Sequence, residues 1–354
     1  MTGRLILEDG LEMAAENFGS ATPVAGEVVF STGMMGYPES LTDPSYKGQI
    51  LVLTYPLIGN YGVPEKQLWE ADNIMVSGLI VSNYIDTPSH FKSQQTLAKW
   101  FISEGIPLLE IKDTRLLTQH IRDKGSLLGK IRFEKDIPFY DPNKENLVAQ
   151  VSTKKPHVLA SSQKKARKIV LIDCGTKRNI QRALVQRGVT VITVPWDCDI
   201  FSVDEKIDFD GIIVSNGPGN PKFVDKTIAI MKKAMERKVP LLGICLGHQL
   251  LTLAAGGDTK KLKYGHRSQN QPCIMRNSPR CYITTQNHGF AVSKIPDNFL
   301  PWFTNANDQT NEGIIHKKLP FMSVQFHPEA TPGPTDAEWI FDFFLERVSA
   351  EHRK

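Results

Sequence analysis

The segment that most constrains this chain is the octapeptide from Gly243 to Leu250, which reads Gly-Ile-Cys-Leu-Gly-His-Gln-Leu. It follows a short apolar run, residues 239–242, and leads into a helix-forming sequence. A buried strand, then Gly-x-Cys-x-Gly, then a helix is typical of a nucleophile elbow, whose glycines permit a turn too tight for side chains. The pattern therefore predicts Cys245 at the carboxyl end of a strand and the amino terminus of a helix, where backbone amides favour a thiolate.

A second segment bears on whether Cys245 reacts or only packs. A lone cysteine at the end of a core strand is commonly a packing residue, because free cysteine is among the most buried residue types. Later in the chain, however, an apolar run ends in Phe326-His327-Pro328-Glu329. If this segment is extended, side chains 327 and 329 point to the same side. We therefore expect Glu329 to orient His327, and His327 to take the Cys245 proton.

A third segment supplies backbone amides at the end of another strand. Ser215-Asn216-Gly217-Pro218-Gly219 follows the apolar run 211–214. Taken alone, Gly-Pro-Gly indicates an ordinary turn. Glycines at a strand end also leave amides open to a substrate, which suits an oxyanion site.

Together, the three segments resemble the class I, triad-type glutamine amidotransferases, in which a cysteine releases ammonia from glutamine and forms a glutamyl thioester. The resemblance implies that Cys245, His327 and Glu329 are the catalytic triad. It also implies that the amides of Gly217 and Leu246 hold the oxyanion, and losing one such donor raises a barrier by about 3 to 4 kcal/mol.

The amino-terminal half resembles the small, glutaminase subunit of carbamoyl phosphate synthetase. The sequence Ser-Thr-Gly-Met-Met-Gly-Tyr-Pro-Glu at 31–39 is part of the match. The matching segments cover residues 26–39, 41–50, 55–62, 113–118, 125–129, 286–292 and 311–314. This resemblance implies a glutamine-hydrolysing carbamoyl-phosphate synthase, in which ammonia passes through a protected channel to a large synthetase subunit that makes carbamoyl phosphate for arginine synthesis, pyrimidine synthesis or both.

The resemblance also names the groups expected to bind glutamine. Backbone groups and neutral polar side chains suit a zwitterion, because they cost little to desolvate and discriminate strongly when unpaired. Taken alone, either Gln249 or Asn287 is at least as well explained as a helix-cap or surface amide. The expected glutamine contacts, which would lie at a domain interface, are Ser45, Gly217, Gly219, Leu246, Gln249, Asn287, Gly289 and Phe290.

No cofactor or metal is expected in this chain. The sequence contains no GxxxxGK[ST] or other recognisable phosphate-binding pattern, so we expect ATP and Mg²⁺ to bind the large subunit. Five cysteines without paired CxxC spacing argue against a disulfide framework or a zinc site. A net charge of +4 gives no case for nucleic acid or a membrane. Cytoplasm is the expected location, since no signal segment or membrane-spanning run is recognisable.

The pattern of apolar runs predicts an α/β protein of two domains. Strands at 169–173, 189–194 and 211–214 alternate with helices at 177–187 and 225–237, as in a doubly wound, mostly parallel sheet. The first half combines short strands with helices at 93–104 and 114–124, which predicts a smaller mixed α/β domain. We place the first domain at 1–152, a polar, basic linker at 153–167 and the amidotransferase domain at 168–350.

Ser268 departs from the family pattern, which usually has glycine at this position. If the position needs a positive φ, serine would cost about 1 kcal/mol or slightly more, or the loop would differ.

Three other functions stay open at this point: a stand-alone γ-glutamyl hydrolase, a non-catalytic regulatory subunit and a piece of a fused multienzyme. The first domain argues against the hydrolase. A helix expected at 336–350, followed by a charged tail, favours a separate subunit.

Overall fold

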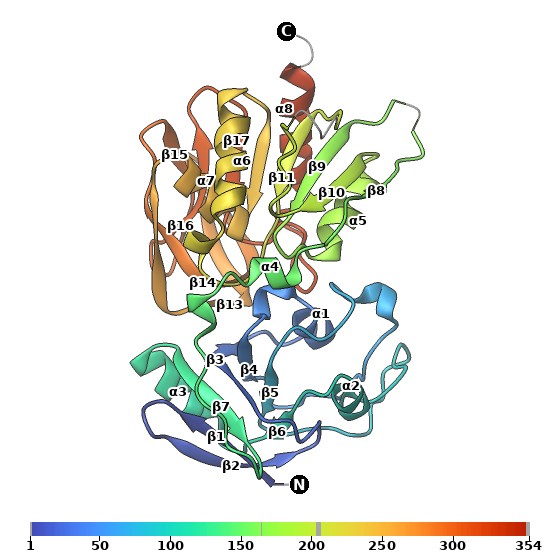
Figure 1. Ribbon diagram of the computed structural model, residues 1–354, viewed down its shortest axis with the longest axis vertical. Helices are drawn as coiled ribbons and strands as arrows, with labels where there is room; N and C mark the ends of the chain where they lie inside the picture. Colours follow the sequence, from blue (N-terminus) through green and yellow to red (C-terminus); the bar gives the residue numbers. More distant parts are fainter. Residues whose placement is uncertain (1, 164, 203–206, 352–354) are drawn as a thin grey trace. The chain divides into compact units, whose positions relative to one another are not determined.

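The computed structural model describes residues 2–163, 165–202 and 207–351 (Figure 1). The chain forms two units. The first comprises Met1–Leu147 together with Lys263–Ser268, and the second comprises Val148–Leu262 together with Gln269–Lys354.

The first unit is built on a closed barrel with strand order β1-β2-β6-β5-β4-β3-β7. Its strands are β1 (Thr2–Leu7), β2 (Glu12–Asn17), β3 (Val24–Ser31), β4 (Gln49–Leu53), β5 (Gly78–Val81), β6 (Leu108–Glu110) and β7 (Leu127–Arg132). Its helices are α1 (Tyr37–Leu41), α2 (Leu97–Ser103) and α3 (Thr114–Lys124), with 3₁₀ turns η1 (Pro44–Tyr46), η2 (Lys66–Leu68) and η3 (Pro142–Lys144).

Successive side chains of a barrel strand point to opposite faces and pack into two different apolar clusters. Ile50 and Val52 of β4 pack with α3, whereas Leu51 and Leu53 pack with α1 and α2. The α3 helix has the predicted bounds, because the Asp113 carboxylate accepts from the Leu116 amide at 2.8 Å and caps its start.

The second unit contains a ten-stranded sheet with order β14-β13-β15-β16-β17-β12-β11-β9-β10-β8. Strands β17, β12, β11, β9 and β10 are mutually parallel. The strands are β8 (His157–Leu159), β9 (Lys168–Asp173), β10 (Thr190–Pro195), β11 (Gly211–Val214), β12 (Leu241–Ile244), β13 (Asp258–Met275), β14 (Cys281–Lys294), β15 (Phe299–Asn305), β16 (Asn311–His316) and β17 (Phe321–Val324). The helices are α4 (Val148–Val151), α5 (Arg178–Gln186), α6 (Asp225–Glu236), α7 (Leu246–Ala254) and α8 (Trp339–Glu351), with the 3₁₀ turn η4 (Pro221–Phe223).

Helices cover both faces of the parallel strands, which explains why these strands are almost wholly apolar. Ile169 and Leu171 of β9 pack with α5 and α8, whereas Val170 and Ile172 pack with α6 and α7. The predicted doubly wound α/β class is thereby confirmed.

Several element boundaries differ from the sequence-based prediction. The α2 helix begins at Leu97 rather than 93, because Thr96 caps it by accepting from the Lys99 amide at 3.3 Å. The α8 helix begins at Trp339 rather than 336. Residues 157–159, expected within a linker, form strand β8, which pairs antiparallel with β10 at the edge of the sheet. Ser268 lies in β13 without a positive φ, so its serine carries no such strain.

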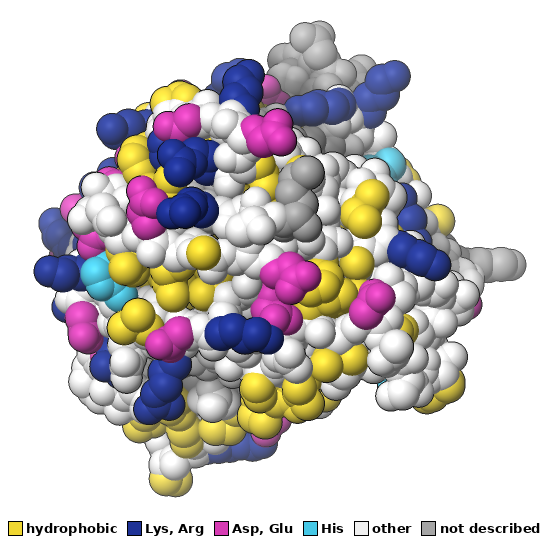
Figure 2. All heavy atoms as spheres, turned by 90° about the horizontal axis from the view of Figure 1, so that it is seen from below, with side chains coloured by type: hydrophobic (Ala, Val, Ile, Leu, Met, Phe, Trp, Pro, Cys, Tyr) yellow, Lys and Arg dark blue, Asp and Glu magenta, His cyan; other side chains and the backbone are white. Residues whose placement is uncertain are grey.

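The surface carries charges of both signs. On the face in Figure 2, lysine and arginine alternate with acidic side chains among the described residues, as 42 basic and 38 acidic residues predict. None of the helices in the described ranges is long and apolar enough to cross a membrane.

The contacts of residues 148–153 place the start of the second unit before the expected linker. Val148 is fully buried in the cluster that contains α6 and α7. Ser152 Oγ accepts from the Trp196 amide at 3.0 Å, and the Thr153 amide donates to Asp173 at 2.7 Å.

We therefore predict that Val148→Ala lowers the free energy of unfolding by about 2 kcal/mol, since two buried methyl groups are lost. Urea denaturation of the full chain measures the change. The matched control is Val158→Ala in β8, where the side chain is 58% exposed and the loss should stay below about 0.5 kcal/mol. Equal effects of the two substitutions would place Val148 outside the core.

Candidate active site

Cys245 lies at a strained turn between β12 and α7. Its backbone has φ 52° and ψ −101°, a region that non-glycine residues rarely adopt. A Cβ at Gly243 would lie 2.4 Å from the Gly247 carbonyl oxygen, and one at Gly247 would lie 2.2 Å from that of Val214. Both positions therefore require glycine, and the predicted elbow is present.

His327 and Glu329 form the expected pair. His327 Nδ1 lies 2.6 Å from Glu329 Oε1, and both side chains are almost completely buried. The segment is not a regular strand, because β17 ends at Val324, but the His327 amide donates to the Thr285 carbonyl at 2.9 Å. Nε2 of His327 is not used in the contact with Glu329, and Cys245 is near enough to raise the pKa of the ring, so this nitrogen is available for proton transfer with Cys245.

The charges of this cluster support one another. Burial opposes the charge on His327, but Glu329 and Cys245 outweigh burial and raise the pKa of His327 to about 10. Burial likewise opposes the charge on Glu329, but Lys177 and His327 lower the pKa of that carboxyl to about 2. At neutral pH the cluster therefore holds a carboxylate between an ammonium and an imidazolium.

Lys177 is a site residue that the sequence analysis missed. Its Nζ lies 3.1 Å from Glu329 Oε1 and donates to the Ala330 carbonyl at 2.6 Å, and its side chain is 2% exposed. The one signal was its position just after β9, because the carboxyl ends of neighbouring parallel strands meet at one edge of the sheet. A single lysine before a helix is otherwise indistinguishable from a surface residue.

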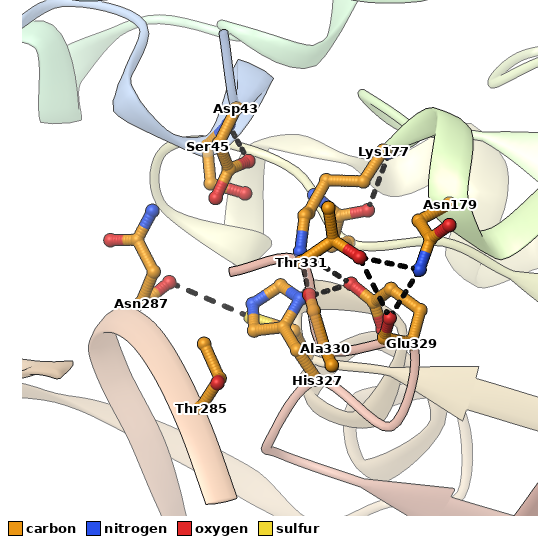
Figure 3. A network of polar contacts seen from close by, with 12 residues as sticks. Asp43, Ser45, Lys177, Asn179, Thr285, Asn287, His327, Glu329, Ala330 and Thr331 are labelled. Atoms are coloured by element: carbon orange, nitrogen blue, oxygen red, sulfur yellow. Dashed lines mark hydrogen bonds and ion pairs between the residues drawn. The ribbon is translucent and has the colours of Figure 1, made fainter. Parts of the chain in front are cut away.

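The turn after Glu329 is held by α5. Ala330 and Thr331 have φ values of 55° and 46°, unusual for residues with a Cβ. Asn179 Nδ2 donates to Thr331 Oγ1 at 2.7 Å and also to the Glu329 carbonyl. Figure 3 shows Lys177 and Asn179 beside this turn, with the His327 ring next to Glu329.

The Gly217 and Leu246 amides have the properties that an oxyanion site needs. Within the described chain, neither N–H has a hydrogen-bond acceptor. A Cβ at Gly217 would lie 2.1 Å from the Cys174 carbonyl oxygen and 2.8 Å from a Leu246 methyl, so these residues are in close contact and Gly217 cannot carry a side chain.

The structure brings most of the remaining predicted glutamine contacts of the second unit together. Gln249 Nε2 donates to the Phe290 carbonyl at 2.8 Å, and Cys245 Sγ lies 3.7 Å from the Asn287 carbonyl oxygen. Gly289 lies in β14 with Asn287 and Phe290. Gly219 has φ 82°, which explains the glycine in this turn.

Ser45 belongs to the first unit, where it lies in η1 and is buried. Its amide donates to the Asp43 carboxylate at 2.9 Å.

His248 and His288 have structural partners. His248 Nδ1 lies 2.9 Å from Ser323 Oγ, and burial lowers the pKa of His248 to about 3, so the ring is neutral. His288 Nδ1 lies 2.8 Å from the Phe290 carbonyl oxygen.

Two family profiles match the chain. The profile described as glutamine amidotransferase class-I matches residues 170–347, and the carbamoyl-phosphate synthase small chain, CPSase domain, matches residues 5–131. The chain therefore belongs to the class-I glutamine amidotransferases. More narrowly, its first unit carries the small-chain domain of carbamoyl-phosphate synthase, which confirms both resemblances.

The curated relatives are much longer proteins. The chain is 50% identical to "Multifunctional protein CAD" of Squalus acanthias, over 97% of this chain and 16% of the relative. It is 45% identical to "Carbamoyl-phosphate synthase [ammonia], mitochondrial" of Homo sapiens, over 98% of this chain and 24% of the relative. Among solved structures, a glutamine amidotransferase of Thermotoga maritima has a TM-score of 0.40 and 15% identity, covering 54% of this chain and 87% of its own.

We predict that Lys177→Met lowers the free energy of unfolding by about 3 to 5 kcal/mol, because it leaves the buried Glu329 carboxylate without its cation. The double variant Lys177→Met/Glu329→Gln should be more stable than Lys177→Met alone, since no lone buried carboxylate remains. Urea denaturation of the wild type, both single variants and the double variant gives the coupling. Additive effects would mean that the two side chains do not interact energetically.

Proposed function

We propose that this chain is the glutaminase part of a glutamine-hydrolysing carbamoyl-phosphate synthase. The observation that carries the proposal is the contact of His327 with Glu329 beside Cys245, in a chain that also has the small-chain domain. Overall similarity cannot decide between glutamine and free ammonia as the nitrogen source, because one relative at 45% identity is named for ammonia. A complete triad favours glutamine.

The first half of the proposed reaction is attack on glutamine. The Cys245 thiolate adds to the side-chain carboxamide carbon, and the amides of Leu246 and Gly217 hold the oxygen that becomes negative. The carbon–nitrogen bond then breaks as the His327 imidazolium gives its proton to the departing nitrogen. Ammonia leaves, and a glutamyl thioester with Cys245 remains.

The second half is hydrolysis of the thioester. His327 is now neutral and takes a proton from water as that water attacks the thioester carbon. The carbon–sulfur bond breaks, which releases glutamate and restores the thiolate and the imidazolium. Glu329 holds the ring in one orientation throughout, and Lys177 keeps Glu329 ionised.

Glutamine is proposed to bind the Gly219, Gln249, Asn287, Gly289 and Phe290 groups, and Ser45 stays a predicted glutamine contact. The ammonia is proposed to pass to a large synthetase polypeptide, which would bind ATP and Mg²⁺ and make carbamoyl phosphate. The proposed domain organisation is a small-chain domain followed by an amidotransferase domain that includes residues 148–159.

We expect purified chain to release ammonia and glutamate slowly from glutamine, and much faster with the synthetase polypeptide, ATP and bicarbonate. Cys245→Ser should lower the release by at least about a hundredfold in both conditions, because the nucleophile is lost. Ammonia-dependent carbamoyl phosphate synthesis by the same complex should survive, which controls for assembly. Release that does not depend on Cys245 would rule out the glutaminase, and fast release indifferent to the synthetase would identify a stand-alone hydrolase.

The raised pKa of His327 predicts the alkaline limb of the pH profile. Because the imidazolium protonates the leaving nitrogen, kcat should fall as pH rises through the His327 pKa of about 10. Replacing Glu329 by Gln, together with Lys177→Met so that no lone charge is buried, removes a cause of that raised pKa. The alkaline limb should then move to lower pH, as steady-state glutamine hydrolysis from pH 6 to 11 would measure. An unmoved limb would show that another group controls it.

A further inference from the structure

Gln325 contacts the proposed nucleophile, and the reaction described above gives it no role. It follows β17 directly and is completely buried. Its side-chain Nε2 lies 3.6 Å from Cys245 Sγ, within hydrogen-bond distance for sulfur. Its backbone N–H donates to the Glu312 backbone carbonyl at 2.9 Å.

The direction of the Gln325 carboxamide is set by a chain of contacts that starts at a backbone carbonyl. The Phe290 carbonyl can only accept, so the Gln249 side chain must face it with Nε2, at 2.8 Å. The same NH₂ group donates its second hydrogen to Gln325 Oε1 at 3.0 Å. Because the oxygen of Gln325 is used in this way, its NH₂ group must face Cys245 Sγ.

The Asn287 carbonyl and the Gln325 NH₂ group, both beside the sulfur, therefore favour opposite protonation states of Cys245. The Asn287 carbonyl oxygen, at 3.7 Å, can accept from the neutral thiol but repels a thiolate. The Gln325 N–H can donate to the thiolate, and hydrogen bonds with an ionised partner are about twice as strong as neutral ones. The buried position strengthens the contact further, since little water screens it.

We propose that Gln325 is a further catalytic residue, whose side-chain N–H donates to Cys245 Sγ and stabilises the thiolate. Gln249 is the positioning residue for this donor, because it holds the Gln325 carboxamide in the required direction. The consequence for turnover rests on the proposed glutaminase function, whereas the contact with the thiolate can be tested without glutamine.

The experiment is alkylation of Cys245 in the full chain by iodoacetamide across pH 5 to 10. Peptide mass spectrometry separates Cys245 from the other four cysteines. Gln325→Met removes the donor and keeps the side-chain length. Gln325→Glu keeps the shape and places a carboxylate oxygen near the sulfur. Gln181→Met is the matched control. It removes a side-chain amide of α5 that donates to Thr193 of β10, in the same unit.

At pH values below the wild-type midpoint we expect alkylation to slow about tenfold in Gln325→Met, because one charge-assisted hydrogen bond is lost, and more in Gln325→Glu. The midpoint of rate against pH should move upward in both variants. Rates should converge with the wild type at high pH, where every Cys245 is ionised, and a general disturbance of the fold would not produce this convergence. Gln181→Met should match the wild type. Where Gln325→Met does not fold, as judged by circular dichroism, Gln325→Glu decides alone.

An unchanged midpoint in a folded Gln325 variant would overturn the proposal, whatever the glutaminase activity. Conversely, a shifted midpoint in a chain that does not hydrolyse glutamine would support the Gln325 contact and reject the proposed function. Where glutamine hydrolysis is present, kcat/KM should fall by the same factor as alkylation measured at the same pH.

Discussion

The strained backbone at Cys245 is the constraint on which the rest of the site depends. With φ 52°, the residue occupies a conformation that its Cβ opposes, at a cost of order 1–3 kcal/mol. The surrounding sheet maintains it, since the Cys245 amide donates to the Val324 carbonyl at 2.8 Å and the Gly247 amide to that of Ser215 at 3.1 Å. Two neighbouring parallel strands thereby fix the turn, and the Leu246 amide is left without an acceptor among the described residues.

The second constraint is the alternation of buried charges from Lys177 through Glu329 to His327. A carboxylate with so little exposure is costly unless cations compensate it. Both cations contact the same oxygen, Oε1, since Lys177 Nζ lies 3.1 Å and His327 Nδ1 2.6 Å from it. Lys177 comes from the segment after β9, whereas the other two residues follow β17. The pairing therefore joins segments that are far apart in sequence and makes the charge state of the site part of the stability of the fold.

The sequence allowed the doubly wound class, the elbow and the His327–Glu329 pair to be predicted, because each has a local pattern. Lys177 and Gln325 could not be assigned in this way, because their roles arise from contacts across the sheet. Strand β8 escaped prediction for a related reason: His157, Val158 and Leu159 are exposed at a sheet edge and lack the apolar alternation that marks a half-buried strand. Local periodicity reports burial, and these three residues are not buried.

In the second unit, the direction of each hydrogen bond also depends on contacts between segments that are far apart in sequence. The Phe290 carbonyl can only accept a hydrogen bond, so Gln249 must turn its NH₂ group toward it and toward Gln325 Oε1. Gln325 must therefore turn its own NH₂ group toward the sulfur. On the other side of the reacting centre, Glu329 fixes Nδ1 of His327 as the donor and leaves Nε2 for proton transfer. The acid–base character of the site thus originates in groups that touch neither the sulfur nor Nε2, which is why a triad motif alone does not define it.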